Sequence, residues 1–122
     1  MTGPMILVVD DDDDVREIMT MALESSGYAV ICAADGVQCI ELLRAHPVPR
    51  LILLDLMMPR MDGWQVCAHL EREPALAEVP VVVLTGNVRA TVAGLKVAGF
   101  LRKPFDLATL LGVVRRHCPL PA

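Results

Sequence analysis

Acidic side chains follow two short apolar segments of the sequence, at points where each segment gives way to an irregular stretch. Asp10 and Asp11 follow Met5–Val9, and Asp55 follows Leu51–Leu54. A short apolar run that ends at turn-forming residues is typical of a buried parallel strand. Because open α/β sheets gather functional groups at the carboxyl ends of their strands, we expect the three carboxylates to lie close together.

A hydroxyl and an ammonium group are expected at the same edge. Thr85 follows the apolar run Val81–Leu84, and Phe100–Leu101 leads into Lys103 and Pro104. Three neighbouring carboxylates would repel one another and raise at least one pKa unless a cation joins them. An all-oxygen site suits a hard divalent ion, so the residues predict a Mg²⁺ site.

Amphipathic segments alternate with apolar runs along the chain. Strands are expected over Met5–Val9, Tyr28–Ala33, Leu51–Leu54, Val81–Leu84 and Phe100–Arg102. Helices are expected between Asp11 and Gly27, over Val37–His46, from about Gly63 to Pro74, over Asn87–Ala98 and over Leu107–Cys118. Strict alternation of strand and helix predicts a parallel sheet that is covered by helices on both faces.

Composition narrows the class of protein. The 122 residues are 54% hydrophobic, which suits a single α/β domain spanning residues 1–122 with a core over about 5–118. The net charge is −4, but Asp10–Asp14 supply five of the 15 acids. With no basic stripe and four aromatic residues, direct nucleic-acid binding is not expected. No apolar run spans a bilayer and no signal peptide precedes the first strand, so we expect a cytoplasmic protein without membrane contact.

The other acids and the cysteines have simpler interpretations. Asp12, Asp13 and Asp14 are expected to form a solvated helix start, capped either by an Asp14–Glu17 capping box or by Asp12. The four cysteines fit no zinc pattern, and the two nearest in sequence, Cys32 and Cys39, are expected to act as small hydrophobes.

Taken in chain order, the motifs resemble the landmark motifs of response-regulator receiver domains in two-component signal transduction, chemotaxis regulators among them. They are Val8–Asp11, Asp55–Gly63, Thr85–Gly86 and Lys103–Phe105. The resemblance runs from about Met5 to the last helix. It implies a flavodoxin-like three-layer sandwich with a five-stranded parallel sheet of order 2-1-3-4-5.

The resemblance also implies a function. Asp55 would accept a phosphoryl group from a histidine kinase or a histidine phosphotransfer protein. Mg²⁺, with Mn²⁺ as a substitute, would be held directly by Asp11, Asp55 and the backbone carbonyl of Met57, with Asp10 acting mainly through water. Such a domain is not an enzyme beyond its own phosphorylation and dephosphorylation, and it acts on a downstream protein as a monomer or weak dimer.

Further roles follow from the same resemblance. Lys103 would place a charge and Thr85 a hydroxyl hydrogen bond on the phosphoryl group, and the Lys103–Pro104 peptide bond would be cis. Phe100 holds the position of a switch aromatic that responds to Thr85, although it is also interpretable as an ordinary core residue.

Other functions are less consistent with the residues. A haloacid-dehalogenase-type phosphatase needs a second Asp two residues after Asp55, where this chain has Met57. An EF-hand loop that starts at Asp10 needs Gly and Glu where the chain has Val15 and Met21. A degenerate receiver that acts as a phosphorylation-independent interaction module stays open as an alternative.

The chain departs from the receiver pattern between Thr85 and Lys103, where it is shorter by roughly one helical turn. We therefore expect the fourth helix, over Asn87–Ala98, to be shortened or irregular. Only Pro119–Ala122 follow the last helix, so the chain is expected to be either a stand-alone regulator or a fragment.

Overall fold

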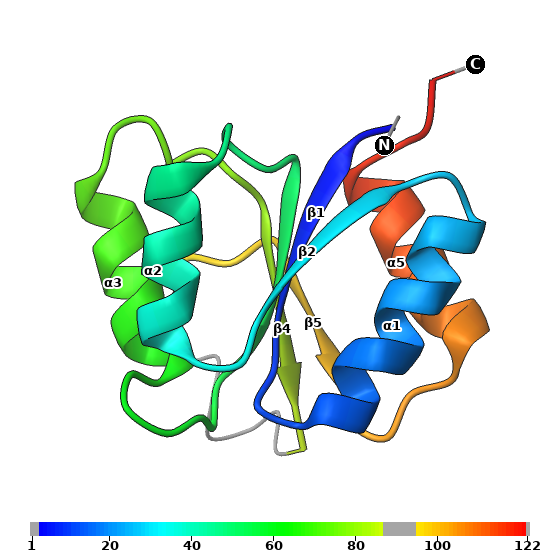
Figure 1. Ribbon diagram of the computed structural model, residues 1–122, viewed down its shortest axis with the longest axis horizontal. Helices are drawn as coiled ribbons and strands as arrows, with labels where there is room; N and C mark the ends of the chain where they lie inside the picture. The colour runs from blue at the N-terminus through cyan, green and yellow to red at the C-terminus, as the bar shows by residue number, and fades with distance from the viewer. Residues whose placement is uncertain (1–2, 87–94, 122) are drawn as a thin grey trace.

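The computed structural model describes residues 3–86 and 95–121. Five parallel strands form one sheet in the order β2-β1-β3-β4-β5 (Figure 1). The strands are β1 (Met5–Val9), β2 (Ala29–Ala33), β3 (Leu51–Asp55), β4 (Val81–Thr85) and β5 (Gly99–Arg102). The helices within the described ranges are α1 (Asp13–Ser25), α2 (Gly36–Ala45), α3 (Gly63–Arg72) and α5 (Leu107–His117).

The helices cover both faces of the sheet, with α2 and α3 on one face and α1 and α5 on the other (Figure 1). This arrangement is the predicted three-layer sandwich, and the strand order 2-1-3-4-5 is confirmed. Because all strands are parallel, their carboxyl ends lie along a single edge of the sheet.

Each strand divides its side chains between two cores, because successive residues of a strand point to opposite faces. In β1, Ile6 and Val8 pack in the core beneath α1 and α5, whereas Leu7 and Val9 pack in the core beneath α2 and α3. All four side chains are fully buried. Burial of such a side chain contributes about 1.5–3 kcal/mol, so the two cores hold the strand ends firmly in place.

Every described helix begins at an aspartate whose side chain accepts backbone N–H bonds of the first turn. These N-caps are Asp12, Asp35, Asp62 and Asp106. The helix start at Asp12 shows that the Asp14–Glu17 capping box is wrong and that its alternative is correct. The capping box lies instead at Asp62 and Gln65, on α3.

The cysteines are all free thiols, and Cys39, Cys67 and Cys118 are buried. Cys32 was expected to act as a small hydrophobe in apolar surroundings, but it lies on β2, an edge strand, and is exposed. Its Sγ lies 3.1 Å from the hydroxyl oxygen of Thr20 on α1.

The predicted irregular fourth helix concerns a segment of which residues 87–94 lie outside the described residues. The described remainder, residues 95–98, contains no helix and leads directly into β5.

None of the described helices combines the length and the apolar character that crossing a bilayer requires.

Gly63 sits where the first turn of α3 packs against the end of β3. A Cβ atom there would lie 2.7 Å from Cα of Leu56 and 2.8 Å from the carbonyl oxygen of Asp55. We therefore expect Gly63→Ala to lower the free energy of unfolding by about 1–3 kcal/mol, a typical cost of overpacking. Urea unfolding followed by circular dichroism measures this change.

Gly112→Ala is the matched control, since Gly112 lies on α5 and an added Cβ would have no neighbour within 4 Å beyond the adjacent residues and the local helix backbone. This substitution should stabilise the protein by about 0.5–1 kcal/mol, because Ala is the better helix former. Equal effects of the two substitutions would contradict the packing argument.

Candidate functional site

Three carboxylates meet at the carboxyl edge of the sheet. Asp10 directly follows β1, Asp11 is the next residue, and Asp55 is the last residue of β3. One oxygen of each lies within 4.8 Å of the others. Asp10 and Asp55 are buried, whereas Asp11 is exposed, so the cluster opens to solvent on one side.

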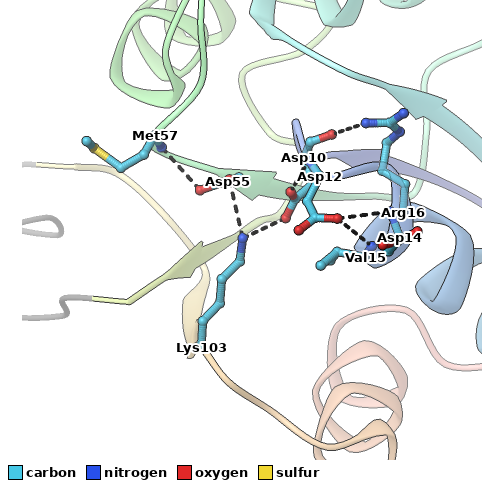
Figure 2. A network of polar contacts seen from close by, with 8 residues as sticks. All are labelled: Asp10, Asp12, Asp14, Val15, Arg16, Asp55, Met57 and Lys103. Atoms are coloured by element: carbon cyan, nitrogen blue, oxygen red, sulfur yellow. Dashed lines mark hydrogen bonds and ion pairs between the residues drawn. The ribbon is translucent and has the colours of Figure 1, made fainter.

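The ammonium group of Lys103 joins two of these acids. Its Nζ lies 2.8 Å from Oδ2 of Asp10 and 3.3 Å from Oδ2 of Asp55 (Figure 2). Lys103 follows β5, and its backbone N–H donates to the carbonyl of Thr85 at the end of β4. The cis peptide bond that the resemblance implied between Lys103 and Pro104 is present.

Each buried carboxylate uses its other oxygen to bind its own loop. Oδ1 of Asp10 accepts the backbone N–H of Asp12 at 2.9 Å, and Oδ1 of Asp55 accepts that of Met57 at 3.1 Å (Figure 2). Both carboxylates are thus oriented by one bond from the loop and one from Lys103. The site is therefore held in a defined arrangement by protein groups.

Burial and charge shift the pKa values in this site. Burial raises the pKa of Asp55 above its ordinary value, and the nearby charge of Lys103 offsets only part of this effect. Burial by itself lowers the pKa of Lys103, but the hydrogen bond and charge of Asp10, with those of Asp55, raise it overall. The Asp55 carboxylate is consequently under-solvated and would gain from a further positive charge.

A group that the sequence analysis missed supports the β1–α1 connection. One guanidinium nitrogen of Arg16 donates to the backbone carbonyl of Asp10 at 2.7 Å (Figure 2). The other guanidinium nitrogen forms an ion pair with Asp13. An arginine in the first turns of a helix carries no pattern that identifies this contact in the sequence. Only the fold brings it back to the strand end.

The remaining predicted residues lie on β4, on β5 and in the loop after β3. Thr85 ends β4 and is buried. Phe100, which pairs with Val83 across β4 and β5, is 49% exposed, so its interpretation as an ordinary core residue was wrong. The Met57 side chain is exposed, and its backbone N–H contacts Asp55.

The donor set fits a hard divalent cation. It consists of carboxylate oxygens and offers no thiolate or imidazole among its members. Cations such as Mg²⁺ and Mn²⁺ prefer such oxygen ligands. The geometry can therefore hold one divalent ion beside Asp55.

Comparisons with a family model and with related sequences indicate the same protein family. The family model of the response regulator receiver domain matches residues 6–115. The DNA-binding dual master transcriptional regulator RpaA of Synechocystis is 38% identical over 116 residues, which cover 92% of this chain and 48% of that protein. The chain thus spans about half the length of the curated relatives it matches.

Solved structures with a similar fold indicate the same family. The chemotaxis response regulator CheY4 of Vibrio cholerae is 27% identical with a TM-score of 0.87, covering 95% of this chain and 99% of that one. The receiver domain of sensor histidine kinase PA1611 from Pseudomonas aeruginosa is 27% identical with a TM-score of 0.86, covering 94% of this chain and 97% of that one. That structure is described as having a magnesium ion coordinated in its active site cleft.

The raised pKa of Asp55 makes its stability contribution depend on pH. A carboxyl whose pKa is higher in the folded state stabilises the fold at low pH, and this contribution is lost as pH rises through the folded pKa. We therefore expect Asp55→Asn to raise the melting temperature of the metal-free protein at pH 7. The gain should shrink toward pH 4, where Asp55 of the unsubstituted protein becomes protonated.

Thermal unfolding in EDTA across this pH range measures the effect. Asp14→Asn removes the same charge from an exposed position near the same edge and is the control. A lower melting temperature of Asp55→Asn at pH 7 would show that the bond to Lys103 outweighs the burial of the carboxylate.

Proposed function

Since the chain belongs to the response-regulator receiver domain family, we propose that Asp55 accepts a phosphoryl group from a histidine kinase or a histidine phosphotransfer protein. The observation that carries this proposal is the position of the Asp55 carboxylate. It lies at a strand end, within 3.3 Å of Lys103 Nζ and beside the carboxylates of Asp10 and Asp11. The alternative is a degenerate receiver that acts only by contact with other proteins. It would be supported by the replacement of a site residue, but Asp10, Asp11, Asp55 and Lys103 are all present.

We propose that the site works with Mg²⁺, for which Mn²⁺ can substitute. Asp11, Asp55 and the backbone carbonyl of Met57 would hold the ion directly, and Asp10 would act through water. When bound, the ion supplies positive charge for the acids and for the oxygens of the phosphoryl group. This assignment is supported by the short distances between the three carboxylates, because one oxygen of each lies within 4.8 Å of the others.

The residues of the chain have distinct tasks in the transfer. An Asp55 oxygen attacks phosphorus as the bond from phosphorus to one nitrogen of the donor's imidazole ring breaks. The ring leaves as a neutral histidine when its other nitrogen carries a proton, and the product on this chain is an aspartyl phosphate. Lys103 then contacts a phosphoryl oxygen, and the Thr85 hydroxyl donates a hydrogen bond to another. Apart from this bond exchange the protein supplies position and charge, and it turns over no other substrate.

The signal would leave the site through β4 and β5. Thr85 would move toward the phosphoryl group, and the exposed ring of Phe100 would move into the space released. This change alters the surface that a downstream protein recognises. Because Phe100 has no hydroxyl group, its outward position is not fixed by a side-chain hydrogen bond. A cytoplasmic location and a monomeric or weakly dimeric state accord with this role.

We expect acetyl phosphate or fluoroberyllate with Mg²⁺ to modify or occupy the protein at Asp55 alone. Intact-mass and phosphopeptide analysis should place the phosphoryl label on Asp55. Lys103 also contacts Asp10, but that side chain is fully buried, whereas Asp55 keeps a small exposed fraction. Asp11→Ala should lose the labelling in Mg²⁺ because it removes a ligand of the ion.

Asp14→Asn again serves as a control with normal labelling. Label retained in Asp55→Asn would place the acceptor elsewhere. Absence of label in the unsubstituted protein, with both donors tested, would favour the degenerate-receiver alternative.

A surface for the phosphodonor protein lies next to the site. A cavity of about 460 Å³ is lined by Val15, Ile18, Met19, Lys103, Pro104, Phe105 and Leu107. Ile18 on α1 and Leu107 at the start of α5 are 52% and 43% exposed, and Met21 on α1 is 63% exposed. An apolar surface beside the reactive carboxylate suits a helical protein that presents a phosphohistidine above Asp55.

Ile18→Glu should slow phosphotransfer from a phosphorylated histidine phosphotransfer protein that labels the unsubstituted chain. We expect a decrease of at least about tenfold, equivalent to about 1.4 kcal/mol, because the charge would be buried on docking. Labelling by acetyl phosphate should not change. Val48→Glu, at an exposed apolar position before β3, is the control. Equal loss with both donors would mean that Ile18 acts on the site itself.

A further inference from the structure

An ion pair links two loops on the α2 and α3 side of the sheet. Nε of Arg60 lies 2.9 Å from Oδ2 of Asp35, and its Nη2 lies 2.7 Å from the same oxygen. Asp35 belongs to the turn between β2 and α2, and Arg60 belongs to the loop between Asp55 and α3. Asp35 is 7% exposed, so the contact is largely shielded from water on the acid's side.

Asp35 is itself fixed by the helix that it caps. Its Oδ1 accepts the backbone N–H of Gln38 at 2.9 Å, which leaves Oδ2 for Arg60. The hydrogen bond from Gln38, followed by that from Arg60, lowers the pKa of Asp35, so the side chain is charged at neutral pH. The arginine is therefore attached to a rigid and ionised acceptor.

A backbone contact lies beside the ion pair. The N–H of Gly36 donates to the carbonyl of Met61 at 3.0 Å. A Cβ atom on Gly36 would lie 2.3 Å from that carbonyl oxygen. The start of α2 and the loop after β3 can therefore approach this closely only because residue 36 is glycine. Arg60 and Met61 together attach the β3–α3 loop to the start of α2.

The conformation of Arg60 shows that the loop is constrained. Its φ angle is +65°, in the left-handed region that costs a non-glycine residue about 1 kcal/mol or more. The two bonds to Asp35 offset this cost. The same loop carries Met57, whose N–H orients Asp55 and whose carbonyl is a proposed ligand of the metal ion.

We infer that the Asp35–Arg60 ion pair is a positioning device that holds the β3–α3 loop in the conformation required for metal binding and phosphoryl acceptance at Asp55. The metal-binding part of this inference rests on the proposed function. Asp35 and Arg60 do not belong to the carboxylate cluster of Asp10, Asp11 and Asp55. They act through the loop.

The substitution Arg60→Asn distinguishes a positioning role of the ion pair from a direct effect of the arginine's charge on Mg²⁺ binding. Asn tolerates a positive φ better than most residues, so the substitution removes the ion pair without adding backbone strain. Loss of a positive charge near an acidic site would by itself strengthen Mg²⁺ binding. Loss of the ion pair would weaken it, so the two explanations predict opposite signs.

Two measurements on the full chain test the inference. Titration calorimetry with Mg²⁺ should show about tenfold weaker binding by Arg60→Asn, a typical effect of losing a group that orients metal ligands. Hydrogen–deuterium exchange of the metal-free protein should show faster exchange of the amides between Met57 and Met61. Asp35→Asn, which keeps an oxygen for the helix cap, should act in the same direction, and the double variant should add little to either.

Arg44→Asn removes the same charge from an exposed position at the end of α2 and should leave both measurements unchanged. Unchanged loop exchange in Arg60→Asn, or unchanged or tighter Mg²⁺ binding, would overturn the inference. Failure of the unsubstituted protein to bind Mg²⁺ would instead overturn the proposed metal site. Faster loop exchange in Arg60→Asn would even then support the positioning of the loop by the ion pair.

Discussion

The parallel pairing of the five strands is the constraint on which the site depends. In a parallel sheet every strand ends at the same edge, so residues that are distant in sequence meet where the ends of their paired strands lie side by side. Asp10 and Asp55 are brought together because β1 and β3 are adjacent, and Lys103 joins them from β5, two strands away from β3. The buried cores on both faces fix the positions of the strand ends.

Electrostatic balance at that edge explains why the cluster can exist in the folded protein. Two buried carboxylates beside a third acid would destabilise the fold, and a single ammonium group offsets much of this repulsion. Burial raises the pKa of Asp55, and the charge of Lys103 offsets only part of this effect. A site that is partly under-neutralised has a physical reason to bind a divalent cation and to respond when a phosphoryl group adds further charge.

The loops after β1 and β3 convert this edge into a defined geometry. On one side Arg16 contacts the carbonyl of Asp10, and on the other Arg60 reaches Asp35. Arg16 binds within the loop after β1, whereas Arg60 lies in the loop after β3 and binds the β2–α2 turn. Their contacts are with groups other than the carboxylates of Asp10, Asp11 and Asp55. The residues that supply the charges of the site are thus different from the two arginines that hold its loops. A substitution of one of these arginines therefore leaves the charged groups of the site in the sequence.

The sequence alone determined the fold class, the strand order through its family resemblance, and the identity of Asp10, Asp11, Asp55 and Lys103, because apolar periodicity and strand-end position are local signals. The boundaries of the strands and of the four described helices were correct to within a residue or two. The helix predicted over Asn87–Ala98 was not, because residues 95–98 contain no helix and residues 87–94 lie outside the described part of the chain. The exposure of Cys32 and Phe100, the choice of Asp12 as the cap, and the contacts of Arg16 and Arg60 were decided only by the tertiary structure. The exposure of a side chain on a strand depends on which other elements cover that strand. The partner of an arginine depends on which distant part of the chain lies beside it in the folded protein. Neither can be predicted from a short stretch of sequence.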